Sequence, residues 1–231
     1  MKEFCVLLDN GHGKDTAGKR SPVWKDGSQL FEWETNRRIV AEIEKRLRKL
    51  GIKVVRLVPE DKDISLGTRS RRANKYVEKY RCVMISVHCD AFDVPNGASG
   101  WTVYTTEKKN ISDNLAQKFL DNFHTFFPDR LLRGHKEKNF TVIYMTQCPC
   151  VLTENFFMTT ERDCRLLMSD EGIETIADLH VKSILDFQQE FYPETVKEMQ
   201  LPDFIPYPMR VNQTPQPTTL GEIYFNGNGA S

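Results

Sequence analysis

Short apolar runs alternate with amphipathic stretches along most of this chain, and that alternation restricts the folds open to it. Residues 4–8 form a continuous apolar run, which is typical of a strand buried on both faces. Residues 35–50 repeat apolar side chains at helical spacing, and Gly51 follows as a stop signal. The alternation predicts an α/β fold, with a mostly parallel, mixed sheet of about six strands sandwiched by helices in a single domain.

The remaining elements follow from the same two patterns. Further strands are expected at 54–58, 82–87, 100–105, 141–145 and 150–153. Further helices are expected at 65–80, with Leu66 facing inward, and at 112–123 and 173–191. Beyond Pro193 the composition changes to proline, asparagine and glycine, which predicts a domain at 1–193 and a tail at 194–231. Within that tail, the short run 220–225 could still dock on the domain.

Charge and composition exclude several classes of partner. The chain has 32 basic and 32 acidic side chains, so no net charge draws it to nucleic acid. No apolar stretch approaches the roughly 20 residues that span a bilayer, so no membrane insertion is expected. The six cysteines lack zinc-finger spacing, and we interpret them as reduced thiols of a protein made in a reducing compartment.

Two histidines follow directly after expected strands. His12 lies between two glycines after the run 4–8, and His88 follows the strand at 82–87. Ligands of open α/β sheets bind at the carboxyl ends of strands, so the two imidazoles form a possible metal pair. Each histidine alone is more simply explained as a hydrogen-bonded turn residue.

Two carboxylates occupy comparable positions. Glu32 precedes the first helix and could complete a site of two imidazoles and one carboxylate, the pattern of catalytic zinc with an open position. The simpler explanation is an acid favoured by the helix dipole, a role that Glu34 could also fill. Glu154 ends the strand at 150–153, where it is either a general base or the partner of Arg69 or Arg133 in a salt bridge.

From about residue 4 to residue 187, the order of these motifs resembles the zinc-dependent N-acetylmuramoyl-L-alanine amidases of bacterial cell separation, spores and phage endolysins. The shared motifs are Asp-x-Gly-His-Gly at 9–13, Glu32-x-x-x-Asn36, Arg69-x-x-x-Ala73-Asn74, Ser86-x-His88-x-Asp90-Ala91, Gly100, Arg133-Gly134 and Pro149-x-x-Leu152-x-Glu154. The ordered set is specific, whereas any single piece is not.

The resemblance implies one zinc ion per chain, held by His12, Glu32 and His88, with Glu154 as the catalytic carboxylate. It implies a catalytic domain that cleaves the bond between N-acetylmuramic acid and L-alanine in peptidoglycan. No other cofactor is implied. Candidate substrate-binding residues are Asn36, Arg69 and Asn74, from the shared motifs, and Arg20, from the long loop at 14–28.

The chain departs from the family after the catalytic carboxylate. The family often has a Gly-Phe pair there and an asparagine shortly afterwards. In this sequence Asn155 is followed by Phe156-Phe157, and Thr160 takes the place of the asparagine. The departure affects the expected loop and substrate fit rather than the metal site.

Other functions remain open on the sequence alone. A zinc hydrolase acting on a different amide would use the same four residues, and a catalytically inactive peptidoglycan-binding module would keep the fold. A structural α/β protein without a site is the third alternative. The residues before the first strand lack a secretory-signal pattern, so we expect an endolysin-like protein, or a secreted one whose signal was removed.

Overall fold

The computed structural model describes residues 2–92, 97–196 and 204 of the 231. Within them the strands are β1 (Phe4–Asn10), β2 (Lys53–Arg56), β3 (Arg81–Asp90), β4 (Trp101–Thr105), β5 (Leu132–Glu137) and β6 (Cys150–Phe157). The helices are α1 (Glu32–Lys49), α2 (Leu66–Val77), α3 (Ile111–Phe126), α4 (Thr141–Tyr144), α5 (Glu161–Met168) and α6 (Asp170–Phe191), followed by the short 3₁₀ helix η1 (Pro193–Thr195).

The strands form one mixed sheet in the order β2-β1-β3-β6-β4-β5. Four neighbours, β2, β1, β3 and β6, are parallel, while β4 runs antiparallel to β6 and β5 runs parallel to β4. This arrangement confirms the predicted six-stranded, mostly parallel α/β fold. It also brings the carboxyl ends of β1, β3 and β6 to the same edge as the start of β4.

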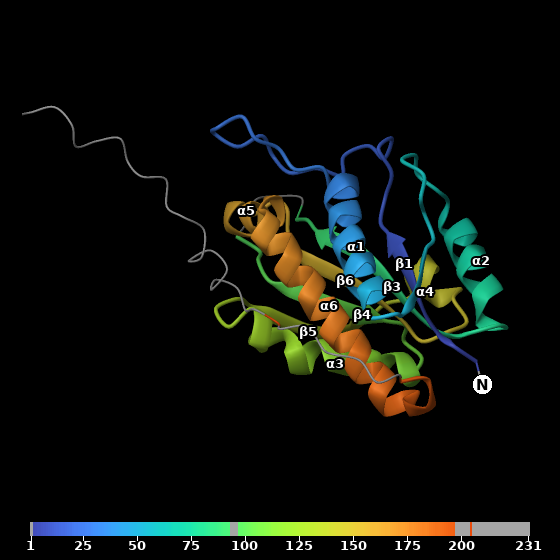
Figure 1. Ribbon diagram of the computed structural model, residues 1–231. Helices are drawn as coiled ribbons and strands as arrows, with labels where there is room; N and C mark the ends of the chain where they lie inside the picture. The colour runs from blue at the N-terminus through green and yellow to red at the C-terminus, as the bar shows by residue number, and fades with distance from the viewer. Residues whose placement is uncertain (1, 93–96, 197–203, 205–231) are drawn as a thin grey trace, which may run out of the picture.

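Helices cover both faces of the sheet (Figure 1). Alternate residues of β1 point to opposite cores: Phe4, Val6 and Leu8 pack toward α1, α3 and α6, and Cys5 and Leu7 toward α2 and α4. Because both faces are buried, β1 reads as an unbroken apolar run. All six cysteines are buried free thiols, as predicted.

Two element predictions were wrong. Residues 141–145 are not a strand; they contain the one-turn helix α4, which buries Val142 and Ile143. The sixth strand is instead β5, which lies at the edge of the sheet and has no fully buried residue, so its sequence lacks an apolar run. Leu66, expected to face inward, is 46% exposed at the start of α2.

The described residues end close to the predicted domain boundary. Helix α6 ends at Phe191 and η1 at Thr195, and the tail region 205–231, with the run 220–225, lies outside the described residues. In the described part of the chain, no helix is both long and apolar enough to cross a membrane.

Candidate metal centre and catalytic site

Two glycines fix the path of the chain around His12. A side chain at Gly11 would place its Cβ 2.2 Å from Cε1 of His88, and one at Gly13 would place it 2.0 Å from the backbone nitrogen of Asp63. Neither approach is possible for another residue. His12 itself adopts a φ of 61°, a left-handed conformation that costs free energy outside glycine. The two glycines therefore allow the His12 loop to lie in close contact with His88 and with the loop before α2.

The side chains of Arg69 and Arg37 donate hydrogen bonds to the backbone of this loop. Arg69 is fully buried; its Nη1 donates to Asp9 Oδ1 and to the Asn10 carbonyl, both at 2.8 Å. Its Nη2 donates to Asp63 Oδ1 at 2.7 Å. Arg37 Nη1 donates to the carbonyl oxygen of His12 at 3.2 Å. These contacts stabilise the strained backbone at His12 and orient its ring.

His12, Glu32 and His88 come together at the edge where β1 and β3 end. One potential ligand atom from each lies within 4.8 Å of the others. Glu32 Oε1 is 3.3 Å from His12 Nε2 and 3.1 Å from His88 Nδ1. The other oxygen, Glu32 Oε2, is buried and has no hydrogen-bond partner among the described residues. Two imidazoles and a buried carboxylate with a spare oxygen can hold a divalent metal ion.

The electrostatics of the site reflect this clustering. Burial alone would raise the pKa of Glu32, but its contacts with the rings of His12 and His88 outweigh burial and hold that pKa below its ordinary value. Burial lowers the pKa of His88, and the contact with Glu32 more than reverses this, so the pKa is raised. Burial also raises the pKa of the Cys89 thiol, which makes Cys89 a poor nucleophile.

Glu154 lies beside the cluster of His12, Glu32 and His88 on the neighbouring strand, since it pairs with His88 across β3 and β6. Neither predicted salt-bridge partner reaches it. Arg69 pairs with Asp9 and Asp63, and Arg133 makes no ion pair with any described residue. Glu154 Oε2 is buried without a hydrogen-bond partner from the residues that the structure describes, and burial raises the pKa of this carboxyl to about 8. A carboxyl in that range can both accept and donate a proton near neutrality.

A buried polar network fixes His88 relative to Glu154. Asn155 donates from Nδ2 to the His88 carbonyl at 3.0 Å and to Thr153 Oγ1 at 3.1 Å, and its Oδ1 accepts from Trp101 Nε1 at 2.8 Å. His180 Nε2 lies 3.0 Å from Thr153 Oγ1, which extends the network into α6. The network therefore links β3, β4, β6 and α6 directly behind the candidate site.

The departure after Glu154 has a structural explanation. The register of β3 and β6 shifts between His88 and Asp90, so β6 carries an extra residue there. Phe156, in the place of the family glycine, adopts a φ of 63°. Its buried ring packs against Phe127 at 5.0 Å. Such a bulge turns the strand and re-aims the side chains beside it, here including Glu154.

The four candidate substrate-binding residues differ in their surroundings. Asn36 is buried; its Nδ2 donates to the Gly11 carbonyl at 3.2 Å and to Glu32 Oε1 at 3.4 Å. Asn36 and Arg69 thus position the site rather than line it. Asn74 Nδ2 donates to the Met145 carbonyl at 3.0 Å, away from the metal ligands. Only Arg20 is exposed, on the loop before α1.

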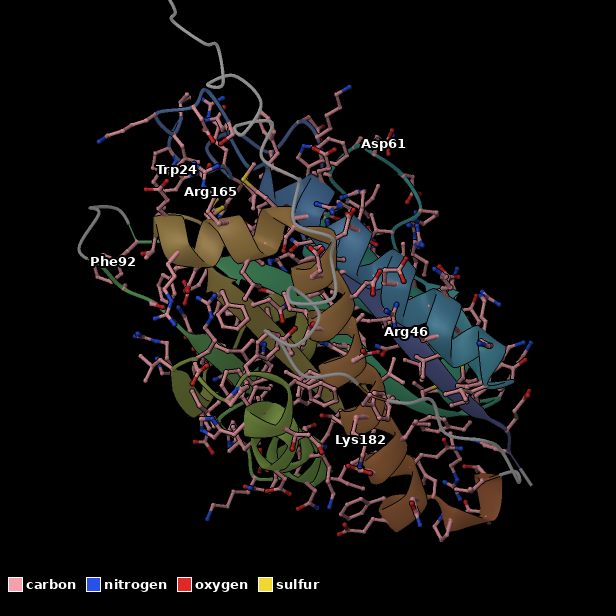
Figure 2. The ribbon with its side chains drawn as sticks, turned by 60° about the vertical axis from the view of Figure 1, so that its left-hand side comes forward. Trp24, Arg46, Asp61, Phe92, Arg165 and Lys182 are labelled. Carbon is pink, nitrogen blue, oxygen red and sulfur yellow. The ribbon has the colours of Figure 1, made fainter. Side chains whose placement is uncertain are left out.

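That loop is attached to α5, a helix that the sequence patterns did not predict. Trp24 Nε1 donates to Cys164 Sγ at 3.2 Å, and Arg165 pairs with Asp26 at 2.7 Å. Figure 2 shows Trp24 and Arg165 close together where the loop meets the helix. Trp24 is therefore a packing residue, whereas Arg20 on the same loop is exposed.

Comparisons with known proteins agree with this geometry. A profile of the family described as N-acetylmuramoyl-L-alanine amidase matches residues 6–186. A Staphylococcus epidermidis protein called probable cell wall amidase LytH is 29% identical over 166 residues, which are 71% of this chain and 51% of that protein. The endolysin of Bacillus phage SPP1 is 28% identical, over 78% of this chain and 65% of that protein. The chain thus spans about half the length of the staphylococcal relative.

Solved structures share the fold. The N-acetylmuramoyl-L-alanine amidase of Clostridium difficile 630 superposes with a TM-score of 0.75 at 26% identity, covering 83% of this chain and 100% of that chain. Amidase AmiC2 of Nostoc punctiforme gives a TM-score of 0.71 at 23% identity, covering 81% and 98%.

Proposed function

Since the chain belongs to the N-acetylmuramoyl-L-alanine amidase family, we propose that it hydrolyses the bond between N-acetylmuramic acid and L-alanine in peptidoglycan. The observation that supports this most is the convergence of His12, Glu32 and His88 beside Glu154 at one sheet edge. The names of two relatives, a probable cell wall amidase and an endolysin, agree with a cell-wall substrate. We assign the activity to residues 1–193 and regard 194–231 as a separate tail.

The same three residues suit one zinc ion per chain. Their donor set of two imidazole nitrogens and one carboxylate is that of catalytic zinc sites that leave a coordination position open. The buried Glu32 Oε2 has no partner in the described part of the chain, which supports a cation at this point, because an unpaired buried carboxylate oxygen is costly. Bound there, zinc supplies Lewis-acid chemistry: it polarises a carbonyl and lowers the pKa of water.

The protein's own residues would carry the proton transfers. Glu154 would accept the proton of the attacking water at its unpartnered Oε2 and later deliver it to the amine of the departing L-alanine. Asn155 would keep the strand of His88 in register with Glu154 during both steps. The presence of all four site residues favours an active hydrolase over an inactive binding module.

Digestion of purified peptidoglycan tests the proposal. We expect free stem peptides that begin with L-alanine, together with uncut glycan strands, because glycoside hydrolysis usually needs a pair of catalytic carboxylates. Mass spectrometry of the products distinguishes the outcomes. New reducing sugar ends without new L-alanine amino termini would contradict the amidase activity. Release of acetate, or cleavage only inside the peptide, would indicate a zinc hydrolase of another amide.

A further inference from the structure

A row of positions leads from Glu154 to the edge of the sheet. Thr102 of β4 lies directly across from Glu154, and Gly134 of β5 lies directly across from Thr102. Residues directly opposite each other on neighbouring strands share a face of the sheet. Gly134 adds no side chain to the row, and a Cβ there would meet nothing within 4 Å. The β5 end of this row therefore has free space beside Gly134.

Polar atoms without partners gather along this row. Glu154 Oε2, Thr102 Oγ1 and Arg133 Nε are each buried and bond to nothing in the described protein. A buried polar group without a partner costs about 1–3 kcal/mol, so most such groups in native proteins are satisfied. Their occurrence on three neighbouring strands marks a place that a polar ligand would complete.

Arg133 lies beside this row, as the extra residue of β5 where its register with β4 shifts between Trp101 and Thr102, and its guanidinium is held in place. It lies 5.0 Å above the ring of Phe157, and its Nη1 donates to the Ser99 carbonyl at 3.2 Å. Nη2 makes no hydrogen bond to a described residue, and no described carboxylate approaches Arg133 within ion-pair distance. The neighbouring acid, Asp90, accepts instead from the backbone nitrogen of Ala91. A fixed guanidinium with an unused edge suits a planar anion.

We propose that Arg133 binds a carboxylate of the stem peptide, on the residue that follows L-alanine. This inference rests on the proposed function. The sugar next to the scissile bond is uncharged once its lactyl carboxyl is amidated, so the nearest substrate anion is on the peptide. Positions two strands apart are separated by about 10 Å, and two extended residues span about 7 Å. The side chain of Arg133 is long enough to span the remaining distance of about 3 Å. The substrate class is therefore peptidoglycan whose second stem residue keeps a free carboxylate.

Two substrates whose γ-carboxyl is already joined to the third stem residue test the proposal: N-acetylmuramoyl-L-alanyl-γ-D-glutamyl-L-lysine and its D-isoglutaminyl counterpart. They differ only in whether the second residue has a free α-carboxylate or an amide. We expect kcat/KM to be at least about tenfold higher for the acid, since the amide lacks the charge that a charge-assisted hydrogen bond needs. Arg133→Gln should remove this preference, mainly by raising KM for the acid. Arg133→Lys should retain part of it, and both variants should keep the metal content of the parent protein.

Lys136→Gln is the matched control. Lys136 lies on the same strand, exposed above the ring of Tyr104 at 6.0 Å, so its loss should leave the preference intact. Equal kcat/KM for the two substrates, or a preference that survives Arg133→Gln, would overturn the role of Arg133 and leave the amidase proposal standing.

A binding measurement separates the two proposals. If the parent protein cleaved neither muropeptide nor peptidoglycan, the proposed function would fail. NMR titration with the free dipeptide L-alanyl-D-glutamate would then decide the role of Arg133. Binding at least tenfold weaker in Arg133→Gln than in Lys136→Gln supports it, and equal or undetectable binding in the parent and both variants overturns it.

Discussion

At the scale of single residues, the two carboxylates of the site, Glu32 and Glu154, have different surroundings. Glu32 is in contact with both histidine rings, whereas Glu154 has an oxygen without a hydrogen-bond partner and no ion pair within the described ranges. The first environment favours the charged form that binds a cation, and the second favours a carboxyl that exchanges protons. Substitution of Glu32 should therefore impair metal binding, whereas substitution of Glu154 should impair proton transfer.

Metal content and turnover, measured together, test this difference. Glu154→Gln should keep about one zinc per chain but lose turnover by roughly a hundredfold to ten-thousandfold, because only the acid–base group is removed. His12→Ala should lose the metal itself, and chelation of the parent protein should abolish activity until zinc is returned. Atomic absorption and peptide-release assays measure the two properties.

Glu34→Gln is the control for those variants, because Glu34 is an exposed acid in the same first turn of α1. It should keep both zinc and turnover. Near-parental turnover in Glu154→Gln, or full zinc content in His12→Ala, would show that the roles are assigned wrongly.

At the scale of elements, the site depends on how β3 and β6 are joined. The bond from Asn155 to the His88 carbonyl crosses the bulge between these strands, and Trp101 fixes the other end of the amide. Asn155 and Trp101 are fully buried, so their effect on the site acts through position and not through contact with substrate.

Asn155→Leu should therefore weaken zinc binding as well as folding. It removes three hydrogen bonds and leaves the Trp101 and His88 groups buried without partners, which should lower the free energy of unfolding by about 3 kcal/mol. Loss of support behind a metal ligand typically lowers metal affinity about 10- to 100-fold. Zinc competition titration and urea unfolding measure the two effects.

Asn122→Leu provides the comparison. Asn122 is a buried asparagine between α3 and α6, bonded to Lys118 and Asp186, far along the chain from the metal ligands. Asn122→Leu should lower the free energy of unfolding by a similar amount and leave the zinc affinity unchanged. If both variants bound zinc as the parent does, the positioning role of Asn155 would be wrong.

The residues at the ends of the buried strands were predictable from the sequence, and the contacts between them were not. His12, His88 and Glu154 each follow an apolar run, because strands covered on both faces are apolar until they reach the edge of the sheet. Strand β5 was missed because an edge strand with half-exposed residues has no such pattern. The network around Asn155 joins residues up to 67 positions apart, which no local pattern reveals.

At the scale of the whole molecule, the buried His180 makes stability depend on pH. Burial lowers its pKa from the ordinary 6.5 to about 4, while its Nδ1 contacts the Ile176 carbonyl at 2.7 Å. The unfolded chain therefore takes up a proton at higher pH than the folded protein does. Stability from this group is full above pH 6.5 and is lost as the pH falls toward 4.

Between pH 7 and pH 5, His180 alone should lower the free energy of unfolding by about 2 kcal/mol. Urea unfolding with a chelator present, so that metal release does not contribute, measures the pH dependence. His180→Gln should have a shallower dependence whatever its absolute stability, whereas His124→Gln, at an exposed position of α3, should match the parent. Identical slopes in all three proteins would contradict the prediction.

The backbone conformation of Phe156 depends on the packing of its ring. A non-glycine residue in the left-handed conformation costs about 1–3 kcal/mol, and here the ring is enclosed by Phe127 at 5.0 Å and Phe123 at 6.3 Å. A change to glycine would relax the backbone but leave a ring-sized space in the core. Smaller side chains in place of Phe123 and Phe127 would leave less packing to offset the strain. Neither change is neutral by itself, so we expect position 156 and the aromatic residues at the end of α3 to tolerate substitution only together.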